Sequence, residues 1–366
     1  MDTNTATQTR TDDLIGRFSS RRFKSWYDER QFRQNIEEGQ PYFNGPSRVP
    51  GPEQHSPSKL LQCHRRVYYQ QANAPAEQPI PEGVFWFGNR FEEEVALPFL
   101  ARAVTGSDTY IQNSVWVDFT VETGAGKLRI RGETDPVIVD GEARPILPTE
   151  IKTKSSVGNL SKPNQHHLAQ LHAYLFGLSE KFGNELSKGI LMYGSRKSLE
   201  TKFFQVEFDE EFWKTTVLEW AKEHTEYRLD NILPPAEPEY EWECNFCEYR
   251  ERCGQASTSF ADEVVSGFLP LTKYPKDRVS EYLDAHPDAK LTPTLGTLYP
   301  SLCDAEGVYP WICPVCSGSY PMEEIEWSGV VSRPPSCPNC STDGIDAYLA
   351  GPKPAAQSGR EWAVIE

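Results

Sequence analysis

Closely spaced cysteines constrain the fold of this chain more than any other feature. Nine cysteines occur in 366 residues. Without a signal peptide we expect them to bind metal rather than to form disulfides, because the cytosol keeps thiols reduced. Cys313-X2-Cys316 and Cys337-X2-Cys340, with 20 residues between them, have the spacing of a zinc ribbon. We predict that these four thiolates bind one Zn²⁺. The alternative, two redox-active pairs, lacks the strand-helix context of thioredoxin.

A second group of thiols, Cys244-X2-Cys247-X5-Cys253, is one ligand short of a four-thiolate site. Its fourth ligand must come from a distant part of the chain. Four thiolates suit a zinc ion or an iron-sulfur cluster equally by count, so spacing alone leaves this choice open.

Charge and hydropathy restrict the class of protein. The formal net charge of −16 argues against a protein that coats nucleic acid nonspecifically, since such proteins carry an overall basic field. No apolar run approaches the roughly 20 residues that a membrane helix needs, and the N-terminus lacks the apolar centre of a signal peptide. We expect a cytoplasmic protein.

Hydrophobic periodicity predicts helices and strands in alternation. Asp140-Gly141 marks a hairpin turn between two of the strands. The order of elements predicts an α/β domain with a mixed central sheet. Helices are expected near residues 19–38, 59–69, 84–104, 163–178, 210–229 and 276–285, and strands near 114–121, 128–139, 145–153, 187–193 and 202–208.

Carboxylates on neighbouring predicted strands form a candidate metal site. Asp135 lies near the end of one strand, and Glu150-Ile151-Lys152 lies on its hairpin partner, so both carboxylates can converge across the ladder. Hard cations such as Mg²⁺ and Mn²⁺ prefer oxygen ligands. Lys152, on the same strand face as Glu150, could orient a metal-activated water or stabilise developing charge. Taken alone, Glu-X-Lys is common on solvated strands.

Two further residues complete a known pattern. Gln170 and Tyr174 stand four apart on the following helix and share a face. With Asp135 and Glu150-X-Lys152 they resemble motifs II and III of the RecB-like PD-(D/E)XK nucleases, over residues 58–254. The resemblance implies a restriction-endonuclease-like mixed sheet flanked by helices, and Gln170 and Tyr174 that contact DNA or position Lys152.

The resemblance also implies the metal ligands. Relatives often carry a histidine in the first motif, four residues after a glycine. Here Gly88-Asn-Arg-Phe-Glu92 has glutamate, and we choose Glu92 over the neighbouring Glu93. The residues expected to hold Mg²⁺ or Mn²⁺ are therefore Glu92, Asp135, Glu150 and Ile151.

RecB-like iron-sulfur nucleases use one lone cysteine before the nuclease core. Cys63 matches it, so the resemblance implies a [4Fe-4S] cluster on Cys63, Cys244, Cys247 and Cys253. The cluster would join the two ends of the domain. We interpret Cys303 as a small buried hydrophobe, and the histidines at 166, 167 and 172 as surface or DNA-facing residues rather than ligands.

The expected organisation follows from these motifs. A polar N-terminal arm (1–57) precedes the nuclease domain (58–254), a connector with a helix (255–305), the zinc ribbon (306–349) and a flexible tail (350–366). We expect a Mg²⁺- or Mn²⁺-dependent deoxyribonuclease that acts on single-stranded DNA or ends in DNA repair or CRISPR adaptation. The ribbon could contact a protein partner. The alternative is a noncatalytic iron-sulfur module that binds DNA or a partner.

Overall fold

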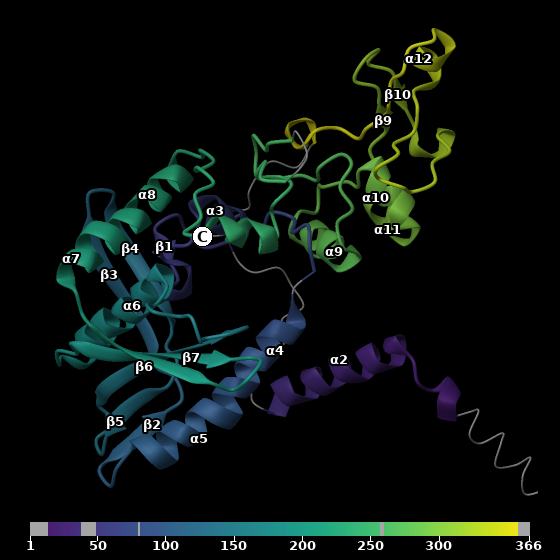
Figure 1. The fold of residues 1–366 in the computed structure, drawn as a ribbon. Coiled ribbons are helices and arrows are strands. Elements are labelled where there is room, and N and C mark those ends of the chain that lie inside the picture. Colours follow the sequence, from purple (N-terminus) through teal and green to yellow (C-terminus); the bar gives the residue numbers. More distant parts are fainter. Residues whose placement is uncertain (1–13, 38–48, 80, 257–259, 358–366) are drawn as a thin grey trace, which may run out of the picture. The chain divides into compact units, whose positions relative to one another are not determined.

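The computed structural model describes residues 14–37, 49–79, 81–256 and 260–357 (Figure 1). Two compact units are present, Met1–Pro46 and Ser47–Glu366.

The first unit contains helix α2 (Ser20–Glu37), which confirms the helix predicted there. Its described side chains are largely exposed. Pairs one turn apart stabilise it, such as Lys24 with Asp28 at 3.4 Å.

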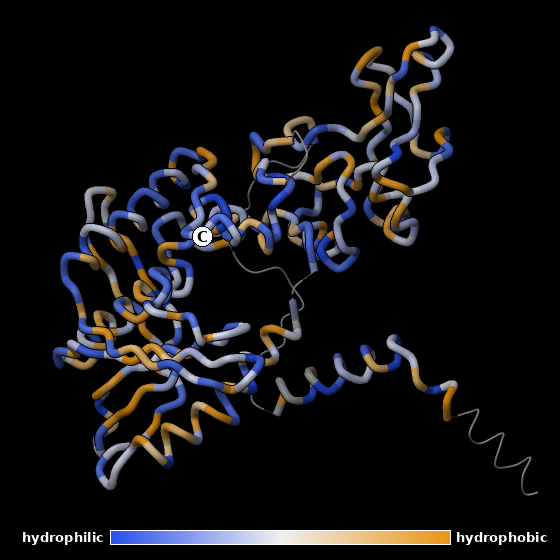
Figure 2. The backbone as a smooth tube through the Cα atoms, in the orientation of Figure 1, coloured by the Kyte–Doolittle hydropathy of each residue, from blue (hydrophilic) through white to orange (hydrophobic). Residues whose placement is uncertain are grey.

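A five-stranded sheet organises the second unit. The strands follow the order β2-β5-β6-β7-β8, in which β6 and β7 are parallel and all other neighbours are antiparallel. Helix α6 (Gln165–Phe182) makes the crossover that parallel strands require. The predicted mixed sheet is therefore confirmed, with apolar stretches along its strands (Figure 2). The bounds are β2 Thr109–Gln112, β5 Val137–Asp140, β6 Pro145–Lys154, β7 Lys188–Ser195 and β8 Thr201–Glu207.

A second sheet packs on the other side of α6. It has the order β1-β4-β3, formed by Gln54–His55, Gly126–Glu133 and Trp116–Thr123. Helix α6 contacts β3 as well as β6 and β7. Buried side chains such as Leu171 and Leu175 join residues of both sheets in one core. Helix α6 ends at Gly183, whose φ of 67° is a conformation that glycine adopts without a Cβ penalty.

The strand predicted over 128–139 is in fact two strands, β4 and β5, which belong to different sheets. The break lies at Thr134-Asp135-Pro136, where proline has no N–H to donate to a ladder. Asp135 therefore lies in the connection between the sheets, two residues after the end of β4 and two before the start of β5. The hairpin turn at Asp140 is confirmed.

A continuous helical segment precedes β2, the first strand of the five-stranded sheet. It runs through α4 (Glu82–Phe91), a π-helical turn η2 (Glu92–Ala96), α5 (Leu97–Phe99) and a second π-helical turn η3 (Leu100–Val104). The prediction of a helix to residue 104 is confirmed, but periodicity did not reveal the π turns. Such turns concentrate at functional sites, and Glu92 opens the first one.

Other helices agree with the prediction to different degrees. The helix predicted at 59–69 begins later, as α3 (His64–Gln71). A short 3-10 turn, η1 (Pro57–Lys59), comes first. Leu61 follows it with φ 57°, a conformation that cannot continue a right-handed helix. The helix predicted at 210–229 is present as α7 (Glu210–Phe212), the π turn η4 (Trp213–Val217) and α8 (Leu218–Leu229). No helix in the described parts of the chain is long and apolar enough to span a membrane.

The C-terminal part of this unit has cores of its own. Helices α9 (Lys276–Ala285), α10 (Pro293–Leu298) and α11 (Pro300–Glu306) surround a cluster that includes Phe268 and Leu291. Helix α9 has the predicted bounds. Cys303 is half-buried against this cluster.

The predicted ribbon (306–349) and the residues that follow it also have ordered structure. Strands β9 (Trp311–Ile312) and β10 (Ser319–Tyr320) form the ribbon hairpin, with helix α12 at Pro338–Thr342. The buried Gln357 accepts a hydrogen bond from Phe268 N at 2.9 Å. Residues 350–357, expected in the flexible tail, are thus partly attached to the domain.

Candidate active site

Three carboxylates and one ammonium converge beside the parallel pair β6 and β7. Glu92 comes from η2, Asp135 from the β4-β5 connection, and Glu150 and Lys152 from β6. Lys152 Nζ pairs with Glu150 Oε1, and Ile151 N donates to Asp135 Oδ2 at 2.7 Å. The structure therefore brings together the acidic residues that the sequence singled out.

Glu150 is the most enclosed member of the group. Its side chain is 0% exposed. Lys152 is its ion-pair partner, but neither carboxylate oxygen has a well-directed hydrogen bond from any described residue. A buried carboxylate is costly unless cations and hydrogen bonds offset its charge, and Lys152 does so only in part. This donor set, which consists of oxygens only, fits a hard divalent ion.

The electrostatics of the group lead to the same conclusion. Burial, followed by the charge of Asp135, raises the pKa of Glu150 to about 8, although Lys152 opposes the shift. Burial and Asp135 likewise raise the pKa of Glu92 to about 7, and burial raises the pKa of Asp135. For Lys152, burial disfavours the ammonium, but Glu150 and Asp135 outweigh this cost and raise its pKa. Three carboxyl groups thus interact with a single ammonium group, that of Lys152.

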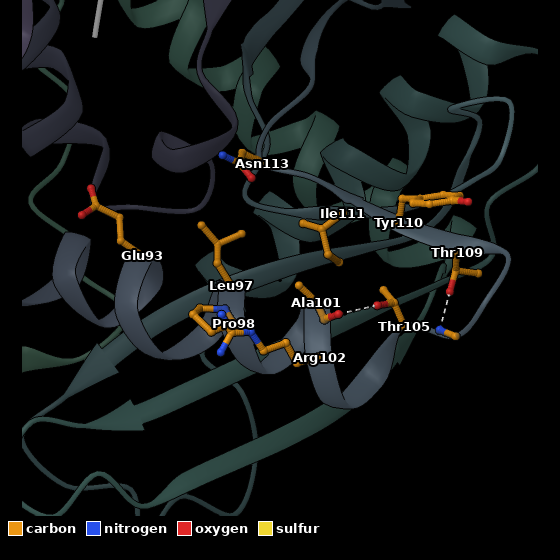
Figure 3. A pocket seen from close by; sticks show the side chains of 11 residues that line it. Glu93, Leu97, Pro98, Ala101, Arg102, Thr105, Thr109, Tyr110, Ile111 and Asn113 are labelled. Carbon is orange, nitrogen blue, oxygen red and sulfur yellow. Dashed lines mark hydrogen bonds between the residues drawn. The ribbon is translucent and has the colours of Figure 1, made fainter. Parts of the chain in front are cut away.

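Glu92 and Glu93, neighbours on η2, have different partners. Glu92 is half-buried and interacts with Asp135 and Lys152. Glu93 is exposed and pairs with Arg90 at 2.8 Å. Figure 3 shows Glu93 at one end of a groove between this helical segment and β2. The groove has none of the predicted catalytic residues in its wall, although Leu97, Arg102 and Tyr110 line it.

Gln170 and Tyr174 lie beneath the site rather than at its mouth. They are 5% and 1% exposed. Gln170 Nε2 donates to the Tyr174 hydroxyl at 2.7 Å, and that hydroxyl donates to the Glu133 carbonyl at 3.0 Å. The pair therefore holds the backbone two residues before Asp135.

Ile151 can offer only its backbone to a metal. Its side chain is buried in a cluster with Phe91, Ala96 and Met192. A Cβ on Gly194 of β7 would overlap the Phe91 ring. The absence of a side chain there lets the helical segment pack on the sheet, and this packing places Glu92.

The histidines of α6 are not the surface residues that the sequence suggested. His167 and His172 are buried. His167 Nδ1 bonds the Tyr193 hydroxyl at 2.8 Å, and His172 Nε2 accepts from Asp209 N at 3.1 Å. Both have structural partners, which sequence spacing could not reveal because these partners lie more than 25 positions away.

His166 requires a second correction. It is half-buried, and its Nδ1 lies 3.0 Å from Glu239 Oε2. A donor atom of Glu243 is also within 4.8 Å of the others. The spacing of nearby residues could not reveal this partner, because Glu239 lies 73 positions from His166 in the sequence.

Cys63 comes close to the distant cysteine triplet. Burial and the Cys63 thiolate raise the pKa of Cys244. Burial raises the pKa of Cys253, and Cys244 and Cys63 contribute to that rise. Burial raises the pKa of Cys247 to about 12, with a smaller contribution from Cys253. All four thiols are half-buried.

The spacing of these four sulfurs is too wide for one tetrahedral ion. They are not among the described groups whose donor atoms all lie within 4.8 Å of one another. Zn–S bonds of about 2.3 Å place tetrahedral sulfurs about 3.8 Å apart.

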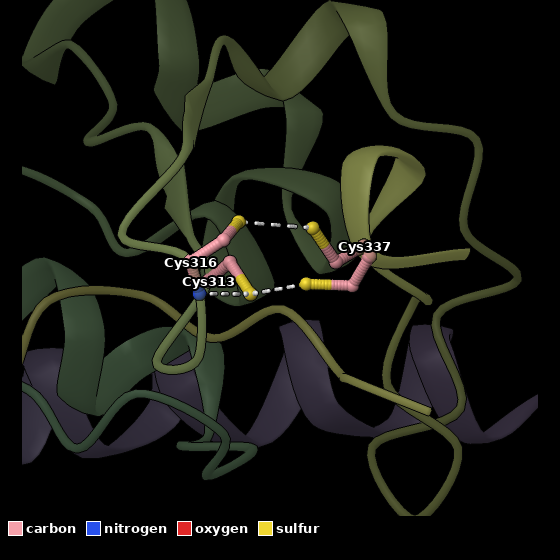
Figure 4. A group of neighbouring side chains, drawn as sticks. Cys313, Cys316 and Cys337 are labelled. Atoms are coloured by element: carbon pink, nitrogen blue, oxygen red, sulfur yellow. Dashed lines mark hydrogen bonds between the residues drawn. The ribbon is translucent and has the colours of Figure 1, made fainter. Parts of the chain in front are cut away.

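The ribbon cysteines have the tighter geometry. Cys313, Cys316, Cys337 and Cys340 form a group within 4.8 Å (Figure 4). The Cys313–Cys340 and Cys316–Cys337 sulfurs are 3.7 and 3.6 Å apart, close to the tetrahedral edge. The predicted four come together here, in a shape that fits one metal ion.

Comparison with known proteins identifies the family. The family model of the PD-(D/E)XK nuclease superfamily matches residues 30–254. The CRISPR-associated exonuclease Cas4 of Saccharolobus solfataricus is 28% identical over 133 residues, which cover 36% of this chain and 56% of that protein. The chain thus matches little more than half the length of this curated relative.

Two solved structures are more distant. The crystal structure of SSO0001 matches with a TM-score of 0.41 at 20% identity, over 62% of this chain and 95% of that one. Rai1 of Scheffersomyces stipitis matches with a TM-score of 0.23 at 17% identity, over 46% and 48%. The extent of the family match, which takes in every predicted catalytic residue, shows that this chain belongs to the PD-(D/E)XK nuclease superfamily.

Proposed function

We propose that this protein is a Mg²⁺- or Mn²⁺-dependent deoxyribonuclease that hydrolyses phosphodiester bonds at single strands or DNA ends. The observation that carries the proposal is the electrostatic interaction of Glu92, Asp135 and Glu150 with one another and with Lys152 in a largely enclosed group. The exonuclease name of the Saccharolobus relative supports action at ends, in CRISPR adaptation or DNA repair.

The chemistry follows from the roles that these side chains can take. Glu92, Asp135 and Glu150, with the Ile151 carbonyl, would hold the ion. When bound, the ion lowers the pKa of a ligated water and offsets charge on the scissile phosphate. Lys152 would orient the attacking water and stabilise the developing charge, a task to which its raised pKa is suited.

Gln170 and Tyr174 would act as positioning residues. Their burial and the hydrogen bond from Tyr174 to the Glu133 carbonyl favour a role in placing Asp135 over direct contact with DNA. The shape of the centre would depend on this buried chain of hydrogen bonds.

The cysteine sites would be structural. We assign a [4Fe-4S] cluster to the group of Cys63, Cys244, Cys247 and Cys253, because Cys63 comes close to the distant triplet and this arrangement resembles that of RecB-like iron-sulfur nucleases. We assign one Zn²⁺ to the ribbon, because its sulfurs are spaced as a tetrahedron requires.

The cost of the buried carboxylates opposes a noncatalytic role. A module that only binds DNA gains nothing from three acidic groups that face one lysine away from solvent. Such a group is maintained at a cost in stability, as is usual for a functional site.

Cleavage of end-labelled DNA tests the proposal. Wild-type protein and Glu150→Ala are incubated with single- and double-stranded DNA, with Mn²⁺ or with chelator. We expect shortened products only from the wild-type protein and only with metal. Equal cleavage by both proteins would show that the proposed active site is wrong. No cleavage by either, from folded protein with its cysteine sites loaded, would favour the binding module.

A further inference from the structure

A second group of metal-binding side chains lies outside the carboxylate centre. His166 is in the first turn of α6. Glu239 lies in the segment after α8, and Glu243 is on the 3-10 helix η5 (Glu241–Phe246). One donor atom of each residue lies within 4.8 Å of the other two. Two segments, the start of α6 and residues 239–243, thus bring one imidazole and two carboxylates close together.

We propose that His166, Glu239 and Glu243 form a second metal site, which takes a divalent transition metal of the class of Zn²⁺. Imidazole nitrogen with carboxylate oxygen suits such ions better than it suits Mg²⁺. With metal-ligand bonds of about 2.1 Å, neighbouring donors lie about 3.0–3.4 Å apart. His166 Nδ1 and Glu239 Oε2 are already 3.0 Å apart.

Charge and enclosure favour a cation at this point. The side chains of His166 and Glu239 are 19% and 16% exposed, so solvent reaches them but screens them weakly. Two acidic groups share a single imidazole, although Lys154 and, for Glu243, Arg66 offset part of their charge. The nearby Lys154 directs its ammonium to Asn164 Oδ1 at 3.0 Å. A divalent ion would offset the remaining negative charge.

A purely structural role explains only part of the arrangement. Glu239 Oε1 accepts a hydrogen bond from Gln165 N at 3.1 Å, as a helix cap does. A cap requires one carboxylate. Glu243, four residues after Glu239, brings another, and that second carboxylate turns a capped helix start into a three-ligand site.

The site would connect two functional parts of the domain. Helix α6 carries Gln170 and Tyr174, and Glu243 immediately precedes Cys244. An ion here would fix the cysteine-bearing segment against α6. With three protein ligands its fourth position stays open, for water or for a phosphate oxygen of a substrate.

Metal counting tests the inference without any need for cleavage. The full chain with its cysteine sites loaded is used in an Asp135→Asn/Glu150→Gln background, which removes the carboxylate centre. Equilibrium dialysis against buffered Zn²⁺, followed by elemental analysis, gives the zinc bound per chain. His166→Asn and Glu243→Gln are compared in this background, with Glu241→Gln as the matched control, because Glu241 is exposed on the same 3-10 helix.

We expect His166→Asn and Glu243→Gln each to lose one equivalent of zinc, or to bind it at least 10-fold more weakly, while Glu241→Gln binds as the background does. Thermal melts establish that each variant is folded, and two variants at different ligands guard against one that is not. Equal zinc in all four proteins would overturn the inference. The background does not cleave, so failure of the nuclease proposal would leave this result unaffected.

Discussion

Lys152 and Lys154 lie on the same strand but have different partners. Lys152 pairs with Glu150, whereas Lys154 donates to Asn164 and lies 5.4 Å from the centre of the Tyr193 ring. We predict that Lys152→Ala lowers the single-turnover cleavage rate by about 10²-fold or more, the scale for one lost preorganised stabiliser. DNA affinity should change little, since one contact among several carries a small share of binding.

Lys154→Ala is the control for this experiment. Its cleavage rate should stay near that of the wild-type protein. If Lys154→Ala lost activity and Lys152→Ala kept it, the assignment of the catalytic strand face would be wrong.

Glu150 should reduce the stability of the metal-free protein at alkaline pH. Its pKa is about 8 in the folded chain and near the usual 4.5 when unfolded, so the folded state binds more protons between these values. Stability should therefore fall as pH rises from about 4.5 to 8. We predict that Glu150→Gln without metal melts about 2–4 °C higher than wild type at pH 8, on the order of 1 kcal/mol.

The difference should shrink toward pH 5, where Glu150 is protonated in the folded protein. Excess Mn²⁺ should raise the melting temperature of wild type more than that of Glu150→Gln, by linkage. A Glu150→Gln protein less stable than wild type at pH 8 without metal would contradict this description of the site.

At the scale of elements, Gly194 controls how the helical segment that carries Glu92 packs on β7. A Cβ there would overlap the Phe91 ring. We predict that Gly194→Ala destabilises the fold by about 1–3 kcal/mol, the usual cost of overpacking, and weakens metal-dependent cleavage by displacing Glu92.

Gly83→Ala provides a matched control on α4, because a Cβ at Gly83 meets nothing within 4 Å. It should be neutral, or more stable by up to about 1 kcal/mol. Equal urea melting curves for the two variants would show that the contact with Phe91 does not position this segment.

Elements with strong periodicity were predictable, and those set by long-range pairing were not. Helix α9 and the hairpin at Asp140 follow from local patterns. The division of residues 128–139 between two sheets does not, because alternation is the same in both strands and only Pro136 hints at the break. The three π turns, η2, η3 and η4, were not predicted either, because the apolar pattern identified only helix in these segments.

The site was predictable to a similar degree. Asp135, Glu150 and Lys152 were singled out because, with Gln170 and Tyr174, they match the motif pattern of a known nuclease family. The contact of His166 with Glu239 joins residues 73 positions apart, and no local spacing encodes such a contact. The burial of Gln170 and Tyr174 was equally hidden, since a shared helix face does not say whether it points to solvent.

At the scale of the whole molecule, we predict that Cys63 joins the start of the nuclease domain to its end through the proposed cluster. Its partners lie about 180 residues away, and closing so long a loop constrains the unfolded chain. We predict that Cys63→Ser, purified without oxygen, loses its iron and most of its visible absorbance, and unfolds at lower temperature. Cys303→Ser, outside both cysteine groups, should keep wild-type iron content. Equal iron in the two variants would refute the assignment of Cys63.

The proposed nuclease activity depends most on which residues bind Mg²⁺ or Mn²⁺. Crystals of the protein soaked with Mn²⁺ can be measured at a wavelength where manganese scatters anomalously. We predict an anomalous peak about 2.1 Å from carboxylate oxygens of Glu92, Asp135 and Glu150, with Glu93 still paired to Arg90. No peak among these three carboxylates at saturating Mn²⁺, or a peak bound through Glu93 instead, would contradict the proposed active site.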